Sequence, residues 1–209
     1  NTQCLLEHMR KIKENWQEHA LDKEQLSLES ATPVQDEDTH ILYQVSYKKD
    51  QDRDDHYVGF VSVPKAADDT TPILAYAHSG ESGLAAAELT RLSLSQSHII
   101  VAPAFPGESL YLNSKQTSKG FEPQDASAIL GMSAGEKSIW DQDADDLLAL
   151  TYLVRENDAN RLPLINTIAG RPIHLMGSSR GGLTTLIAQL KMAIIPTGPY
   201  LHNITKTLV

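Results

Sequence analysis

A run of small residues near the carboxyl end of the sequence carries the clearest chemical signal. Residues 177–182 read Gly-Ser-Ser-Arg-Gly-Gly and fit the pattern Gly-x-Ser-x-Gly, with Ser179 at its centre. A serine hydroxyl can attack a carbonyl carbon and form a covalent acyl intermediate when a neighbouring base takes up its proton. We therefore expect Ser179 to be a nucleophile; a glycine-rich structural turn is the alternative interpretation.

The segments on either side of Ser179 determine how it would be presented. Residues 173–176 form an apolar run typical of a strand, and residues 183–190 have the composition of a helix. A strand, a sharp turn and a helix together make a nucleophile elbow, in which the serine hydroxyl stands clear of the backbone. Gly177 and Gly181 lack a Cβ, which would let the strand and the helix approach each other closely.

Length, composition and charge restrict the class of protein. The 209 residues are enough for one substantial core, and 41% hydrophobic with 22% charged residues is typical of a soluble globular protein. The formal net charge of −9 argues against nucleic acid and anionic membranes as partners. The sequence has no run of about 18 apolar residues, so no transmembrane helix is predicted. The single cysteine, Cys4, excludes an internal disulfide and a multi-cysteine zinc site.

The first third of the chain predicts a helical extension followed by a hairpin. Apolar residues recur at helical spacing over residues 3–20, which predicts an amphipathic packing helix. Residues 22–38 are polar and acidic, and we interpret them as a connection. Alternating apolar residues over 41–47 and 57–63 predict two strands joined by a charged loop, which makes an antiparallel hairpin.

From residue 73 onward, short buried strands alternate with helices. The predicted strands are apolar runs at residues 73–77, 98–102, 173–176 and 193–195. The predicted helices cover residues 85–94, 139–154 and 183–190. Residues 103–137, rich in Gly, Pro and Ser, are expected to be a long irregular loop. This alternation predicts an α/β fold, a mostly parallel sheet with helices on both faces, preceded by the hairpin and the N-terminal helix.

The same pattern divides the chain into two parts. Residues 1–38 would be an N-terminal helical extension and linker, and residues 39–209 would be the α/β core. The helix at 139–154 begins with a cluster of carboxylates that we interpret as solvated and favoured by the helix dipole, rather than as metal ligands. These carboxylates are Asp141, Asp143, Asp145 and Asp146.

Several motifs occur in the order in which one known family carries them. Residues 77–81 read Ala-His-Ser-Gly-Glu after the strand at 73–77, and residues 102–109 read Ala-Pro-Ala-Phe-Pro-Gly-Glu-Ser after the next strand. A helix containing Asp-Asp-Leu-Leu-Ala-Leu and the elbow at 177–182 follow. Over residues 40–200 the chain resembles the α/β-hydrolase superfamily, in particular serine hydrolases of the prolyl-oligopeptidase-like and esterase branches. The elbow is the most specific of these matches.

The resemblance implies an oxyanion hole built from two backbone N–H groups. By the family pattern, one donor is the amide of Arg180 and the other is the amide of Gly80. His78 would shape this turn by hydrogen bonding and would not be the general base. The candidates for the substrate pocket follow the carboxyl ends of two strands, where ligands bind in open α/β sheets. They are Ser79, Glu81, Phe105, Glu108 and Tyr111.

The largest departure from the family concerns the acid and the base. In this fold the order along the chain is serine, then Asp or Glu, then His. After Ser179 the sequence has no Asp or Glu and a single histidine, His202. Three explanations stay open: the core is a fragment that is incomplete at its C-terminus, the protein is inactive, or earlier residues supply the base. The candidates for such a base are His56, His98 and Asp68.

The end of the chain gives the fragment hypothesis a second motive. Only Lys191 and Met192 separate the predicted helix at 183–190 from the predicted strand at 193–195. Relatives of this fold usually have a longer helix and a larger connection at this place. We therefore expect residues to be missing near position 190.

The sequence thus predicts a serine hydrolase that cleaves a small-molecule ester, and less readily a peptide or amide, through an acyl-enzyme at Ser179. The alternative is a catalytically inactive hydrolase-fold protein that acts as a binding or scaffold module. The chemistry implies no cofactor and no metal. A start at Asn1 rather than Met favours an exported or periplasmic protein, and the single cysteine is also compatible with the cytoplasm.

Overall fold

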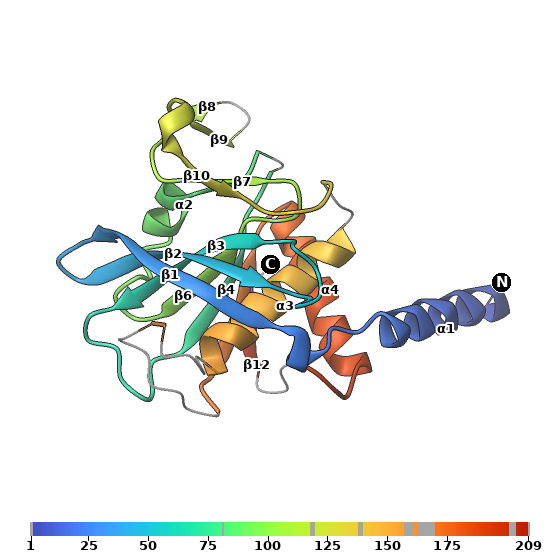
Figure 1. The fold of residues 1–209 in the computed structure, drawn as a ribbon. Helices are drawn as coiled ribbons and strands as arrows, with labels where there is room; N and C mark the ends of the chain where they lie inside the picture. Colours follow the sequence, from blue (N-terminus) through green and yellow to red (C-terminus); the bar gives the residue numbers. More distant parts are fainter. Residues whose placement is uncertain are drawn as a thin grey trace.

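A seven-stranded sheet with the order β1-β2-β3-β6-β4-β11-β12 forms the centre of the molecule (Figure 1). The computed structural model describes residues 2–80, 82–117, 120–137, 140–156, 161–162, 170–200 and 204–208. The strands of this sheet are β1 (Ser27–Asp36), β2 (His40–Lys48), β3 (Tyr57–Pro64), β6 (Ile99–Pro103), β4 (Ile73–Ala77), β11 (Ile173–Gly177) and β12 (Ile204–Leu208).

The sheet is mixed, which corrects the expectation of a mostly parallel one. β1, β2, β3 and β6 are joined by antiparallel pairings, whereas β6, β4, β11 and β12 run parallel to one another. The predicted hairpin is present as β2 and β3, but it continues the main sheet. The interpretation of residues 22–38 as a connection is wrong, because β1 occupies most of that segment. Its half-exposed, polar side chains suit an edge strand and hide the apolar alternation.

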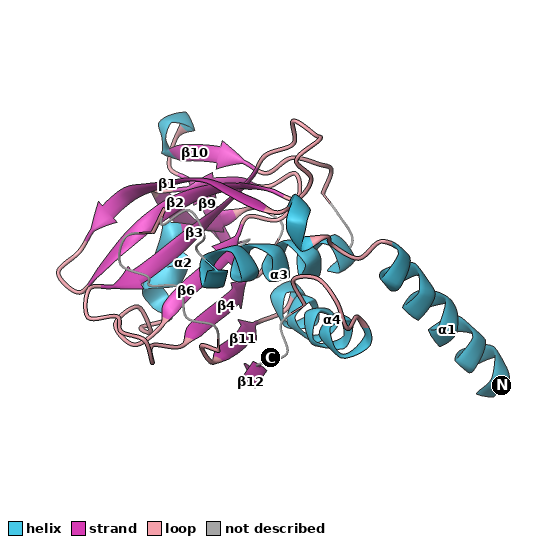
Figure 2. Cartoon of the chain, turned by 60° about the horizontal axis from the view of Figure 1, so that its bottom comes forward, coloured by secondary structure: helices cyan, strands magenta, loops and turns pink. Residues whose placement is uncertain are grey.

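Both faces of the sheet are covered, as the strand periodicity requires (Figure 2). In β4, Ile73 and Ala75 belong to one hydrophobic cluster, while Leu74 and Tyr76 belong to another on the opposite face. Helices α3 (Trp140–Glu156) and α4 (Arg180–Ile194) pack on the first cluster. The second cluster is covered by α2 (Ala86–Arg91) and a small sheet of β5 (Leu84–Ala85), β7 (Ser109–Tyr111) and β10 (Ile129–Met132).

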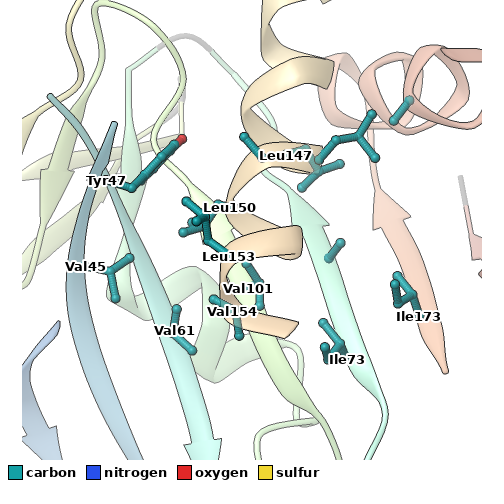
Figure 3. Close-up of a cluster of buried hydrophobic side chains, with 14 of the residues drawn as sticks. Val45, Tyr47, Val61, Ile73, Val101, Leu147, Leu150, Leu153, Val154 and Ile173 are labelled. Atoms are coloured by element: carbon teal, nitrogen blue, oxygen red, sulfur yellow. The ribbon is translucent and has the colours of Figure 1, made fainter. Parts of the chain in front are cut away.

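Helix α3 supplies much of the larger cluster. Its leucines and Val154 point toward the sheet, where Val61, Val101 and Ile73 meet them (Figure 3). Leu147 and Leu150 are fully buried. A fully buried leucine side chain contributes about 1.5–3 kcal/mol relative to an exposed one. This packing fixes α3 beside the strands that carry the site.

The segment 103–137 is more ordered than its composition predicted. It holds β7 and β10 together with a hairpin of β8 (Ser114–Thr117) and β9 (Gly120–Pro123), and a short 3₁₀ helix at Ala126–Ala128. A second 3₁₀ helix, Lys23–Gln25, precedes β1. The strands of this segment have three or four residues each, too few to show a period of two in the sequence.

The predicted strand at 193–195 is wrong. Helix α4 continues through Ala193 and ends at Ile194, with Ile195 as its C-cap. The following strand is β12. A short apolar run is equally compatible with a buried helical turn, which explains the error. The short helix-to-strand connection that motivated missing residues near position 190 therefore does not exist.

Helix α1 (Thr2–Glu18) projects from the body of the molecule (Figures 1 and 2). Only its last turn packs, because Trp16 lies against the core and the side-chain amide of Gln17 donates to the carbonyl of Ile194 at 3.3 Å. The helix was predicted correctly, but its role in packing was not, since most of its apolar face is exposed. Among the described residues, no helix combines the length and hydropathy needed to cross a membrane.

The carboxylates at the start of α3 are paired and largely buried, so the expectation of a solvated first turn is wrong. Asp146 is fully buried and forms an ion pair with Lys49. Burial raises the pKa of Asp146 to about 6, although the charge of Lys49 acts in the opposite direction. Lys191, itself buried, lies 3.0 Å from Asp141 and 2.8 Å from Asp145. These contacts attach α3 to the hairpin side and to α4.

The Lys49–Asp146 pair yields a prediction about stability. Removing one partner leaves the other charge buried and unpaired, so Asp146→Leu or Lys49→Met alone should lower the free energy of unfolding by about 3–5 kcal/mol. The double variant should recover most of that loss, because two apolar side chains need no partner. Urea unfolding of the four proteins measures this cycle. Single variants within about 0.5 kcal/mol of wild type would contradict the assignment of a buried pair.

Candidate active site

Ser179 stands at the junction between β11 and α4, where the sequence predicted an elbow. Its backbone has φ 55° and ψ −122°, a conformation that residues with a side chain rarely adopt. Such strain costs on the order of 1–3 kcal/mol and persists only where the surrounding structure enforces it. The side chain is exposed, so its hydroxyl is accessible.

The glycines beside Ser179 permit the close approach that produces this turn. A Cβ added at Gly181 would overlap the carbonyl group of Ala77 at the end of β4. A Cβ at Gly177 would overlap the backbone of Gly181. The elbow is therefore in close contact with the end of β4, and the turn that follows β4 lies beside the elbow.

Ser179 shares a cavity of about 360 Å³ with the turn that follows β4. Gly80 lies in that turn with φ 85°, in the left-handed region that glycine tolerates. The cavity contains hydroxyl, amide and charged groups beside one aromatic ring. It is lined by Ser79, Gly80, Ser82, Gly83, Glu88, Arg91, Gln116, Gly120, Phe121 and Ser179.

The amide of Arg180 is the first N–H of helix α4. The first turn of a helix has no intrahelical acceptors for its N–H groups, and the helix dipole adds partial positive charge there. An oxygen that develops negative charge above Ser179 would therefore meet a favourable potential. The two segments expected to supply oxyanion donors, 179–180 and 78–80, meet at one cavity.

The side chain of Arg180 turns away from the cavity and joins three other segments. Its Nη1 lies 2.5 Å from Glu108 Oε1 and donates to the carbonyl of Gly80 at 3.0 Å. Its Nη2 lies 2.8 Å from Asp143 Oδ2 in α3. Burial alone would lower the pKa of Arg180, but Glu108 and Asp143 raise it above the usual range. The guanidinium is thus a buried, permanently charged bridge, which we call the Arg180 bridge.

His78 and Phe105 complete the surroundings of this bridge. The His78 ring is fully buried and stacks on Phe105 with the ring centroids 4.4 Å apart, and its Nε2 lies 3.1 Å from Glu108 Oε2. Burial would raise the pKa of Glu108, but His78 and Arg180 together lower it. Glu108 therefore stays ionised between the two side chains. This arrangement agrees with the expectation that His78 shapes the turn.

The structure separates the expected pocket residues into two groups. Ser79 lines the cavity beside Ser179, and Glu81 lies outside the described residues. Phe105, Glu108 and Tyr111 do not line this cavity; they are buried behind its wall. Glu108 contacts Arg180 and His78 there, and the hydroxyl of Tyr111 donates to the carbonyl of Ser82. Their place after a strand end was correct, but their side chains point into the protein.

Several residues of the site were not expected from the sequence. The side chain of Arg180 and Asp143 carry the bridge, although the acidic start of α3 gave no sign of a partner 37 residues away. Glu88 and Arg91 of α2, with Gln116 and Phe121 of the β8–β9 hairpin, form much of the cavity wall. The hairpin residues lie in a segment that had been interpreted as irregular, so no pattern directed attention to them.

The earlier residues considered as a base lie elsewhere in the described structure. His98 precedes β6, and its Nε2 lies 3.1 Å from Nδ1 of His174 near the start of β11. The carbonyl of Asp68 accepts a hydrogen bond from Arg171, which lies just before β11. Both positions are at the amino ends of the parallel strands, about 15 Å from the end that carries Ser179.

His56, also considered as a base, contacts other residues in the described structure. His56 pairs with Glu29 of β1 at 2.7 Å and lies 3.4 Å from Asp54. His202 lies outside the described residues. No histidine is among the described residues that line the cavity. The described part of the cavity wall therefore brings Ser179 together with the 78–80 turn, α2 and the β8–β9 hairpin.

Comparison with known proteins found likeness at the level of structure. No protein-family model matches the chain, and no curated protein matches it in sequence. The ligand-bound rice cell wall degrading esterase LipA from Xanthomonas oryzae is 12% identical, with a TM-score of 0.48, and the match covers 87% of this chain and 47% of LipA. Acetyl xylan esterase 1 from Thermoanaerobacterium sp. JW/SL YS485 is 14% identical, with a TM-score of 0.45 and coverage of 88% and 55%.

A third match is an acetyl xylan esterase from Paenibacillus sp. R4, at 18% identity, a TM-score of 0.42 and coverage of 91% and 56%. These three matched proteins are esterases. The chain spans about half the length of the solved structures that it matches.

The Arg180 bridge predicts a pH-dependent contribution to stability. Glu108→Gln leaves the buried guanidinium with one carboxylate, which should lower the free energy of unfolding by about 3–5 kcal/mol near pH 7. Because the pKa of Glu108 is lowered by folding, its stabilisation is present above the unfolded-state pKa and is lost as the pH falls through the folded-state pKa. The difference in the free energy of unfolding between wild type and Glu108→Gln should therefore become smaller on acidification.

Urea unfolding at a series of pH values from about 7 down to about 3 measures this difference, because the stabilisation is lost only below the unfolded-state pKa of glutamate, about 4.3. Glu136→Gln, an exposed carboxylate of the same loop region, is the matched control and should follow wild type. A constant difference between Glu108→Gln and wild type across the series would contradict an ionised Glu108 in the bridge.

Proposed function

We propose that this protein is a serine hydrolase that cleaves a small ester through an acyl-enzyme at Ser179. The single observation that carries the proposal is the exposed, strained Ser179 at the junction of β11 and α4, facing a cavity that it shares with Gly80. Strain of this kind is retained where it serves a mechanism, and a serine that only closed a turn would need no such conformation.

In this mechanism, Oγ of Ser179 attacks the carbonyl carbon of the ester while its proton passes to a base. The carbonyl oxygen becomes an oxyanion, which the backbone amides of Arg180 and Gly80 stabilise. Collapse of the tetrahedral intermediate breaks the bond to the alcohol, which leaves with a proton, and the acyl group stays on Ser179. A water molecule then attacks the acyl-enzyme and releases the carboxylic acid, regenerating the serine.

The Arg180 bridge supports the oxyanion role of the 78–80 turn. Its guanidinium holds the carbonyl of Gly80 on one side and the carboxylate of Asp143 in α3 on the other. Donors act best when they are already in position before charge develops, because no reorganisation is then paid during the reaction. The same residue thus supplies a backbone donor and fixes its counterpart.

An ester is favoured over an amide because the two leaving groups make different demands. An amine departs only with help from a general acid, the role that histidine plays in serine proteases. No described residue of the cavity wall is a histidine. The proposal therefore assigns the nucleophile to Ser179 and the oxyanion donors to the backbone amides of Arg180 and Gly80.

The second candidate is a binding or scaffold protein with a hydrolase fold and no catalysis. It is favoured by one observation: among the described residues, no histidine lines the cavity beside Ser179. A serine hydroxyl without a base is a weak nucleophile, so this protein would keep the cavity but not react. Covalent labelling distinguishes the two candidates.

A fluorophosphonate probe tests the proposed nucleophile. Wild-type protein should be labelled, and Ser179→Ala should abolish labelling, because the probe reacts with an activated serine. The neighbouring exposed serine provides a matched control, since Ser178→Ala should retain labelling. Labelled protein is quantified by intact mass. Undiminished labelling of Ser179→Ala would contradict the proposal, and an unlabelled wild-type protein would favour the scaffold candidate.

A further inference from the structure

We propose that the cavity beside Ser179 binds esters that carry a carboxylate, and that Arg91 is the residue that binds it. The inference rests on the proposed function only in taking this cavity as the substrate site. Its observations are independent of the nucleophile, because they concern the part of the cavity wall formed by α2 and the β8–β9 hairpin.

Arg91 is the last residue of α2, and its side chain is exposed at the cavity. Its Nη2 donates to the side-chain oxygen of Gln116 at 2.6 Å. Its guanidinium carbon lies 4.7 Å from the centre of the Phe121 ring. Amide and ring come from the two strands of one hairpin, so they hold the plane of the guanidinium between them.

The partners of Arg91 leave its charge available. No carboxylate forms an ion pair with Arg91 among the described residues, and one hydrogen bond to Gln116 occupies one of its five N–H groups. Arg180 is the contrasting case in the same region, because two buried carboxylates neutralise it. A planar guanidinium with free donors matches a carboxylate in shape as well as in charge.

Glu88, the other ionisable group among the described lining residues, already has hydrogen-bond partners. Glu88 lies one helical turn before Arg91 and is buried, with contacts to the hydroxyl of Tyr76 and the backbone amide of Ala85, each at 3.4 Å. Burial raises the pKa of Glu88, which favours its neutral form and weakens its competition for Arg91. Among the described lining residues, Arg91 is therefore the one cation, and the neighbouring serines offer only hydroxyl groups.

Arg91 also lines the adjacent cavity of about 430 Å³, together with Gln35, Thr90, Asn113 and Gln124. The guanidinium thus stands at the boundary between two cavities, one of which contains Ser179. An ester whose carboxylate lies several bonds from the scissile carbonyl would place its reacting end at Ser179 and its anionic end at this boundary.

The test measures binding without catalysis. The full protein carrying Ser179→Ala is titrated with monoethyl succinate, monoethyl glutarate and monoethyl adipate, and with ethyl levulinate, in which a methyl ketone replaces the carboxylate of the succinate ester. Dissociation constants are obtained by ligand-observed NMR. The three chain lengths cover different distances between the ester and the carboxylate. Arg91→Gln and the control Lys115→Gln, an exposed cation of β8, are introduced in the same background.

We expect at least one of the monoesters to bind more tightly than ethyl levulinate, and Arg91→Gln to weaken it about tenfold or more, as for a charge-assisted hydrogen bond. Lys115→Gln should leave its affinity within about twofold, because an exposed charge that does not touch the ligand is screened. Equal binding of monoester and levulinate, or equal loss of both with Arg91→Gln, would overturn the proposal. So would the absence of binding by every monoester.

A second variant separates a binding role from a purely structural one. Gln116→Leu removes the hydrogen bond that ties Arg91 to the hairpin but keeps the cation. If Arg91 binds the ligand, the preference for the monoester over ethyl levulinate should survive in this variant. Loss of that preference would mean that Arg91 acts only by holding the hairpin. Since Ser179 is absent throughout, failure of these measurements is distinguishable from failure of the nucleophile to be labelled.

Discussion

The buried guanidinium of Arg180 is the contact on which the arrangement of the site depends. It joins the elbow to Glu108 in the loop after β6, to Asp143 in α3 and to the carbonyl of Gly80 after β4. These segments lie far apart in the sequence. Because a buried charge that loses a partner is costly, the position of each segment constrains the others. Hydrophobic packing brings α3 to the sheet, and the bridge then fixes the local geometry.

The two arginines of this region have different proposed roles: Arg180 positions the elbow and the turn after β4, and Arg91 binds a carboxylate of the substrate. Arg180 lies between two carboxylates and contacts the 78–80 turn, and in the proposed mechanism this contact orients the backbone amides before charge develops. Arg91 is exposed, and its described partners are an amide and an aromatic ring, which orient its charge without neutralising it. The same side chain thus serves opposite purposes, and burial together with the available carboxylates decides which.

The sequence predicted those features that depend on local patterns. The apolar run at 73–77 predicted β4, and the glycine-rich turn around Ser179 predicted the elbow. A buried strand requires consecutive apolar residues and a tight turn requires glycine, so both can be recognised from adjacent residues. The Arg180 bridge could not be predicted in this way, since an acidic helix start has the same sequence whether its carboxylates are solvated or paired. The edge strand β1 was hidden by polar, half-exposed residues, and the apolar run at 193–195 fits a helix end as well as a strand.

The central claim is that Ser179 attacks beside two preorganised backbone donors. A crystal structure of the full protein with a phosphonate adduct tests it most directly. The account predicts phosphorus bonded to Oγ of Ser179 and one phosphoryl oxygen within about 3 Å of the backbone nitrogens of Arg180 and Gly80. A phosphoryl oxygen directed to solvent, with both amides bonded to other acceptors, would contradict it.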